Sequence, residues 1–166
     1  MMIIVIDLLV ILLLVLLNGF FALSEMALVS SRRARLKQLA EDGHRGARSA
    51  LALTEDPGRF LSAVQIGITL IGIFAGAFSG ATLAHKLAAW LAGFPSLAPF
   101  AETISIFLVV LGITYLSLIL GELVPKRVAL ANAEVVASRV ARPMKLLAKL
   151  AAPAVWLLRI SSEAVL

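Results

Sequence analysis

TISIFLVVLGITYLSLILGELVPKR, residues 103–127, is the stretch of this chain that decides the fold. Its apolar run is long enough to cross a bilayer, which takes about 20 helical residues. One acidic residue, Glu122, lies near the end of the run, three positions before Pro125. Because proline has no N–H, the carbonyl of Gly121 loses its helical donor beside that carboxylate. Both oxygens suit hard cations such as Mg²⁺ or Ca²⁺. The stretch therefore predicts a membrane span ending in a cation site. A helix end with a surface glutamate and a stop proline is the alternative.

The composition of the whole chain indicates a bilayer rather than water as its solvent. Its 166 residues are 61% hydrophobic, with a mean hydropathy of +1.01, whereas soluble domains are roughly 45–50% apolar. The length fits one membrane domain. The chain has no cysteine, which excludes disulfides, thiolate metal sites and thiol catalysis.

Three hydrophobic spans are expected, at about residues 2–24, 61–84 and 101–123, so the predicted fold is an all-α membrane protein. The first run lacks a basic start and a convincing cleavage site, which favours a retained helix over a signal peptide. Seven basic residues lie between 32 and 59 and six between 126 and 149, while the connection between the second and third spans has only Lys86. The positive-inside rule then places the N-terminus outside and the C-terminus in the cytoplasm, in the cell (inner) membrane.

The two basic segments are expected to lie along the cytoplasmic surface. Residues 32–56 form a juxtamembrane pair of short amphipathic helices with a break at Asp42-Gly43, and residues 133–160 form a belt helix divided by Pro143 and Pro153. Trp156 is then placed at headgroup depth. Nucleic-acid binding is the rival interpretation of these charges. It is disfavoured because no aromatic residues interleave with them.

Glycines recur every four residues in the second span, at Gly72, Gly76 and Gly80. Such rows of small residues let membrane helices approach closely, so they predict tight packing against another span or a second subunit. Gly67 and Gly72 are also candidates to expose backbone carbonyls where the helix is locally unwound.

Polar residues gather near the inner ends of all three spans. Asn18, Ser24 and Glu25 interrupt the first span, Gln65 and Thr69 the second, and Glu122 the third. Oxygen ligands without histidine or cysteine suit a hard cation rather than zinc or copper. The local alternatives are hydroxyls of Ser24 and Thr69 bonding back to their own helices, and Glu25 pairing with Arg32 or Arg33. Asp7, near the outer end of the first span, is expected to be interfacial. No catalytic motif is visible, so no enzyme activity is expected.

Three motifs in order resemble one known family: NGFFALSEMALVSSRRARLKQLAEDG at 18–43, QIGITL at 65–70 and GELVPKRVALANAE at 121–134. Together they resemble the transmembrane domain of unknown function 21 (DUF21) of the CorC/CNNM magnesium transporters. The resemblance covers nearly the whole chain. It implies a dimeric three-span domain that exports Mg²⁺ in exchange for Na⁺ from a cavity open to the cytoplasm.

The resemblance also implies which residues hold the ion. Ser24 matches the family's serine, Glu122 its acidic residue, and the second span contributes around Gly67 to Gly72. Many relatives carry asparagines in that span, where this chain has Ile68 and Gly72, so a backbone carbonyl or the hydroxyl of Thr69 would have to replace the missing amides. The predicted metal ligands are Ser24, Thr69, Gly72 and Glu122.

The resemblance further implies cytoplasmic CBS domains and a small C-terminal domain, which are expected to be absent from this chain because it stops at Leu166. The hypothesis is a homodimeric exporter of divalent cations, with Mg²⁺ as the transported ion and Na⁺ as the exchanged one. A membrane anchor and dimerisation module that moves no ions is the alternative.

Overall fold

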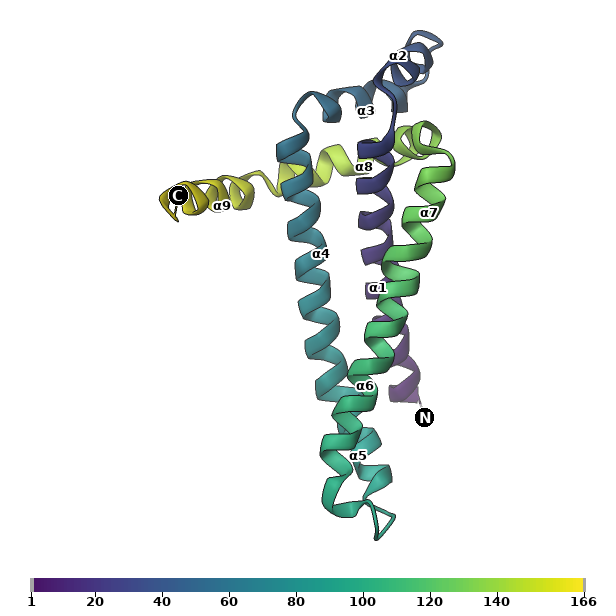
Figure 1. The fold of residues 1–166 in the computed structure, drawn as a ribbon, viewed down its shortest axis with the longest axis vertical. Coiled ribbons are helices and arrows are strands. Elements are labelled where there is room, and N and C mark those ends of the chain that lie inside the picture. The colour runs from purple at the N-terminus through teal and green to yellow at the C-terminus, as the bar shows by residue number, and fades with distance from the viewer. Residues whose placement is uncertain (1, 166) are drawn as a thin grey trace.

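Three long helical rods run side by side along the molecule (Figure 1). The computed structural model describes residues 2–165, and the side chains of all of them except 2–4, 79–81 and 165. The first rod is helix α1, Met2–Ser30. The second is α4, Pro57–Ser79, continued by a π-helical turn η1, Gly80–Ala84, and by α5, His85–Leu91. The third comprises α6, Ala101–Leu118, a π-helical turn η3, Ile119–Leu123, and α7, Val124–Ala131.

The rods confirm the predicted fold class. Over the described residues three helices are long and apolar enough to cross a membrane, Val5–Ser30, Pro57–Leu91 and Ala98–Ala131, and no strand occurs there. The rods extend beyond the ranges expected from hydropathy. A helix that leaves the apolar layer can continue into the interface, because its backbone hydrogen bonds are internal.

Amphipathic helices gather at one end of the rods (Figure 1). They are α2, Arg33–Glu41, and α3, Arg45–Glu55, between the first two rods, followed after the third rod by α8, Ala133–Leu150, and α9, Ala152–Val165. The predicted break between the first pair is present. Gly43 adopts a φ of +92° there, a left-handed conformation that glycine accepts at a helix C-terminus without steric cost. A short 3₁₀ turn η2, Ala98–Phe100, lies at the opposite end.

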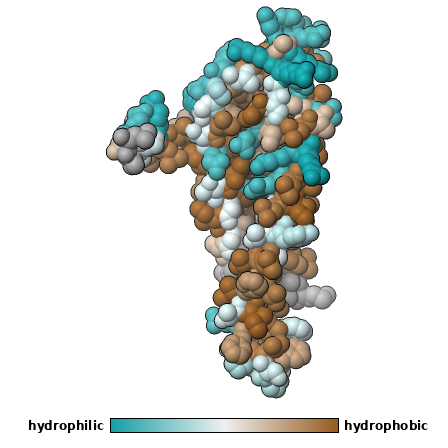
Figure 2. Space-filling model, in the orientation of Figure 1, coloured by the Kyte–Doolittle hydropathy of each residue, from teal (hydrophilic) through white to brown (hydrophobic). Residues whose placement is uncertain are grey.

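The best-packed part of the molecule is at this amphipathic end rather than in the middle of the rods. The buried cluster joins Phe21 and Leu28 of α1, Leu36 of α2, Val64 of α4 and Met144 of α8. Figure 2 shows the corresponding surface, with hydrophilic residues over α2 and α3 and hydrophobic residues along the far half of the rods. This distribution suits a protein whose far half lies in lipid.

Helices α3 and α8 touch through their backbones. A Cβ placed on Gly46 would come within 2.1 Å of the carbonyl oxygen of Ser138, far inside van der Waals contact. Only glycine fits there, so the two amphipathic helices are held in one register.

One sequence interpretation of the C-terminal segment is wrong. Pro143 lies inside α8 and does not divide it, whereas the expected division at Pro153 is present as a break at Ala151, just before that proline. Pro143 and Arg139 are both exposed, so solvent can satisfy the carbonyl that the proline leaves without a helical donor.

Asp7 is buried within the protein, and its carboxylate forms an ion pair with Lys86 of α5. A buried carboxylate requires such a partner. The pair joins the first and second rods at the end opposite to α2 and α3.

Candidate functional site

The wide turn η3 carries Glu122 and interrupts the third rod within the predicted cation-binding stretch. It spans Ile119–Leu123 and precedes Pro125 in the first turn of α7. A proline removes one helical donor, and a π-helical turn is one way to accommodate it without breaking the rod. Turns of this kind are frequent at functional sites.

The carbonyl beside Glu122 has a partner from another helix. The amide nitrogen Nδ2 of Asn18 donates a hydrogen bond to the carbonyl oxygen of Gly121, at 3.3 Å. Asn18 is only 8% exposed, and its own oxygen Oδ1 has no hydrogen-bond partner among the described residues. A buried amide oxygen without a partner costs free energy. The polar atom without a hydrogen-bond partner at this turn is therefore the side-chain oxygen of Asn18, whereas the sequence had indicated the carbonyl oxygen of Gly121.

Helix α1 and the wide turn are in direct backbone contact beside Asn18. A Cβ built on Gly19 would lie 2.8 Å from the carbonyl oxygen of Leu120 and 3.0 Å from Cγ of Pro125. Both distances are shorter than a normal carbon contact. Glycine at position 19 therefore lets α1 lie against the turn that holds Glu122.

The carboxylate of Glu122 is accessible and only weakly held. Its side chain is 40% exposed, and Oε2 lies 3.6 Å from Nζ of Lys126 one turn later. This distance is longer than the roughly 2.7–2.9 Å of a charge-assisted hydrogen bond, so the pair is loose. The carboxylate can therefore exchange Lys126 for another cation at little cost.

Ser24 is fully buried in α1, and its hydroxyl donates to the carbonyl oxygen of Phe20 at 2.7 Å. This is the local bond that the sequence offers as the alternative to metal ligation. A hydroxyl that donates its proton still carries acceptor lone pairs, so the bond leaves the oxygen chemically able to bind a cation.

Thr69 and Gly72 lie on the exposed surface of α4. A Cβ built on Gly72 would meet no atom within 4 Å. Among the described residues, no hydrogen bond or ion pair joins Thr69, Ser24 and Glu122 to one another, and no three acidic or histidine residues cluster closely enough to hold a metal. The structure thus brings α1 and the wide turn together, while the two predicted residues of α4 face outward.

A second polar junction ties the end of α1 to the start of α8. The backbone N–H of Arg32 donates to Oε1 of Glu134 at 3.2 Å. The hydrogen bonds from the backbone N–H of Glu134 itself and from that of Arg32, aided by the charges of Arg35 and Arg32, hold the pKa of Glu134 below its usual 4.5. Arg32 is thus engaged with Glu134 through its backbone. No ion pair of Glu25 with Arg32 or Arg33 occurs in the described part of the chain.

Comparison with known protein families decides the identity of this fold. The model of the cyclin M transmembrane N-terminal domain matches residues 8–166. The chain belongs to the CNNM family. The resemblance inferred from the three sequence motifs is confirmed.

Individual CNNM relatives match over most of this chain. UPF0053 protein sll0260 of Synechocystis is 58% identical over 92% of the chain and 34% of the relative. The polyamine export protein of Escherichia coli K12 is 33% identical over 90% of the chain and 33% of the relative. UPF0053 protein YhdP of Bacillus subtilis is 32% identical over 96% of the chain and 36% of the relative. The chain therefore spans about a third of the length of these relatives.

Proposed function

We propose that this CNNM domain exports a divalent cation, Mg²⁺, in exchange for Na⁺, through a site on the cytoplasmic side of the membrane. One observation carries the proposal. The accessible carboxylate of Glu122 lies on a wide helical turn beside Asn18. The amide nitrogen of Asn18 donates to the carbonyl oxygen of Gly121, and its buried side-chain oxygen has no partner among the described residues.

The chemistry of these groups favours a hard cation. A carboxylate and neutral oxygens are the ligands that Mg²⁺ takes, usually while it keeps several waters. A cation arriving at Glu122 displaces the weakly held ammonium of Lys126. Na⁺ can compete for the same oxygens, which gives a physical basis for exchange.

Export requires a movement of the helices, and the observed contacts indicate which helices must move. Ser24 donates to its own helix, and Thr69 and Gly72 face outward. We propose that α4 and α1 shift relative to the wide turn when the ion binds, so that oxygens of Ser24 and of the segment around Thr69 and Gly72 complete the site. The intact hydrogen bond between Asn18 and Gly121 then belongs to the ion-free state.

The orientation proposed for the chain follows from charge. The basic helices α2, α3 and α8 lie at one end of the rods, and this end takes the cytoplasmic side under the positive-inside rule. The N-terminus is then outside and the C-terminus inside the cell membrane.

A second copy of the chain is the proposed partner in the membrane. Only 28% of the most apolar part of the second rod is buried, and a Cβ built on Gly72 of α4 would meet no atom within 4 Å. A row of small residues on such a face supports close helix packing in lipid, so we propose a homodimer through this face of α4.

A second candidate cargo is a polyamine, which the name of the E. coli relative favours. The ammonium groups of a polyamine would be accepted by the carboxylate of Glu122, and such a cation needs no octahedral ligand set. A non-transporting membrane anchor remains the alternative from another functional class.

The test is efflux from proteoliposomes loaded with Mg²⁺ or with labelled spermidine, with Na⁺ outside. Glu122→Gln should lower Mg²⁺ efflux by about 10- to 100-fold, the range seen when groups around a metal site are lost. Glu41→Gln, an exposed glutamate at the end of α2, is the matched control and should leave efflux unchanged.

The outcomes separate the three candidates. Mg²⁺ efflux that is equal in the parent and in Glu122→Gln would refute the role of Glu122. Efflux of spermidine but not of Mg²⁺, dependent on Glu122, would mean that the transported cation is a polyamine. Efflux of neither cation from the parent protein would favour the non-transporting membrane anchor.

A further inference from the structure

Helix α9 extends away from the side of the three rods (Figure 1). Its large apolar side chains are exposed, among them Trp156, Leu157 and Leu158, and polar residues such as Arg159 and Ser162 follow them along the helix. A helix of this pattern lies in the plane of the membrane interface, with its apolar side toward the acyl chains and tryptophan at headgroup level.

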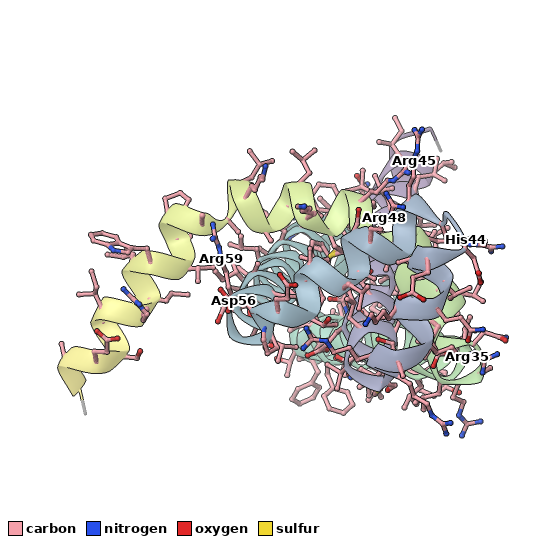
Figure 3. All side chains as sticks on the ribbon, turned by 90° about the horizontal axis from the view of Figure 1, so that it is seen from above. Arg35, His44, Arg45, Arg48, Asp56 and Arg59 are labelled. Atoms are coloured by element: carbon pink, nitrogen blue, oxygen red, sulfur yellow. The ribbon has the colours of Figure 1, made fainter. Side chains whose placement is uncertain are left out.

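A cleft of about 940 Å³ lies between α9 and the first turns of α4. Its walls are of two kinds. Ala152, Val155 and Leu158 of α9 give an apolar wall, and the guanidinium-bearing residues Arg59 and Arg159 give basic positions. Figure 3 shows Arg59 and Asp56 on the side of the bundle from which α9 departs.

A smaller hollow of about 200 Å³ adjoins the cleft and shares Asp56 and Arg59 with it. Lys145 and Lys149 of α8 line its other side. The two hollows are thus lined by four cations, Arg59 and Arg159 with these two lysines, and by one carboxylate, that of Asp56.

The acidic residues nearby compensate only part of this positive charge. Asp56 keeps its negative charge while its Oδ1 accepts the backbone N–H of Arg59 at 3.1 Å. Arg159 lies 3.8 Å from Glu163, but both side chains are about two-thirds exposed, so this pair is weak. The cleft therefore fits an occupant that is anionic at one end and apolar at the other.

We propose that this cleft binds an anionic phospholipid of the adjacent leaflet. The phosphate lies between Arg59 and Arg159, with Lys145 and Lys149 adding attraction, and an acyl chain runs along Val155 and Leu158 beside Trp156. Basic pockets beside membrane helices take anionic lipid headgroups in this way. A free phosphate would leave the apolar wall unused. The proposal is independent of the transported cation.

The test uses Trp156 as the reporter. In a Trp90→Phe background, Trp156 is the remaining tryptophan, and Trp90 lies on α5 at the other end of the rods. The protein is reconstituted in phosphatidylcholine vesicles doped with a low fraction of phosphatidylglycerol, and only one of the two lipids carries brominated chains. We expect brominated phosphatidylglycerol to quench Trp156 more strongly than brominated phosphatidylcholine at equal mole fraction.

Two double variants test the assignment to this cleft. Arg59→Gln with Arg159→Gln should lower the preference for phosphatidylglycerol by about fivefold or more, since each cation near an anionic surface contributes about that factor. Arg33→Gln with Arg45→Gln removes the same charge from exposed positions of α2 and α3, and Arg45 lies across the bundle from Arg59 (Figure 3). This control pair should keep the preference.

Two results would overturn the proposal. One is equal quenching by the two brominated lipids in the parent protein, which would mean that the cleft does not select the anionic headgroup. The other is an equal loss of preference in the control pair, which would mean that general surface charge attracts the lipid.

Discussion

Replacing Gly19 by alanine is the sharpest test of the contact between α1 and the wide turn. The new methyl group would lie 2.8 Å from the carbonyl oxygen of Leu120 and 3.0 Å from Cγ of Pro125. Ordinary contact begins at 3.4 Å, so α1 and the turn must separate by the difference between 2.8 and 3.4 Å. Overpacking of this kind costs about 1–3 kcal/mol.

The matched control is Gly112→Ala, in α6 of the same third rod. A Cβ at Gly112 would meet no atom within 4 Å. Both substitutions gain the same helix preference of alanine over glycine, about 0.5–1 kcal/mol. The difference in stability between the two variants therefore isolates the packing cost, and we expect Gly19→Ala to be the less stable by about 1–3 kcal/mol.

The assay is the free energy of unfolding in mixed detergent micelles, followed by the loss of helical circular dichroism. Mg²⁺ binding, measured by titration calorimetry on the same samples, reports the site. Under the proposed function it should weaken in Gly19→Ala and stay unchanged in Gly112→Ala. Equal stability of the two variants would show that α1 does not lie against the turn, and the reasoning about Asn18 and Glu122 would fail with it.

Two further predictions concern the ends of the rods. Asp7→Asn should destabilise the protein by about 1–3 kcal/mol, less than for a fully buried pair because the Lys86 side chain is 36% exposed. In thermal unfolding, the double variant Asp7→Asn with Lys86→Gln should recover part of this stability. A double variant no more stable than Asp7→Asn alone would contradict the pairing. Because the pKa of Glu134 is lowered in the folded state, its stabilising effect is present above the unfolded value and is lost as the pH falls through the folded one. The melting difference between the parent and Glu134→Gln should therefore be largest near neutral pH and shrink below pH 4.5, and a difference that persists unchanged in acid would refute it.

The overall fold was predictable because hydropathy alone identifies apolar runs that must be helical in lipid. The break at Gly43 and the amphipathic character of residues 32–56 were equally visible in local sequence. Contacts between distant segments were not. The pairing of Asp7 with Lys86 joins residues 79 positions apart, and hydropathy could not reveal it because it treats each residue alone.

The candidate site was predictable in part for the same reason. The missing N–H of Pro125 directs attention to the carbonyl of Gly121, because that effect is local in the sequence. The donor that satisfies this carbonyl comes from Asn18, 103 positions earlier, and no periodicity links the two. Asn18 was noticed only as a polar interruption of a hydrophobic span. Its depth near Glu122 was the one available signal that it belongs to the site.

The backbone contact of Gly46 with Ser138 has a mechanical consequence. Because no side chain separates α3 from α8 at this point, any larger residue at position 46 would force the two helices apart, and their contact couples the position of one helix to that of the other. Helix α3 connects directly to the second rod, and α8 leads to the C-terminal end of the chain. A tilt of the second rod would therefore move α3, and with it α8 and the C-terminal end of the chain.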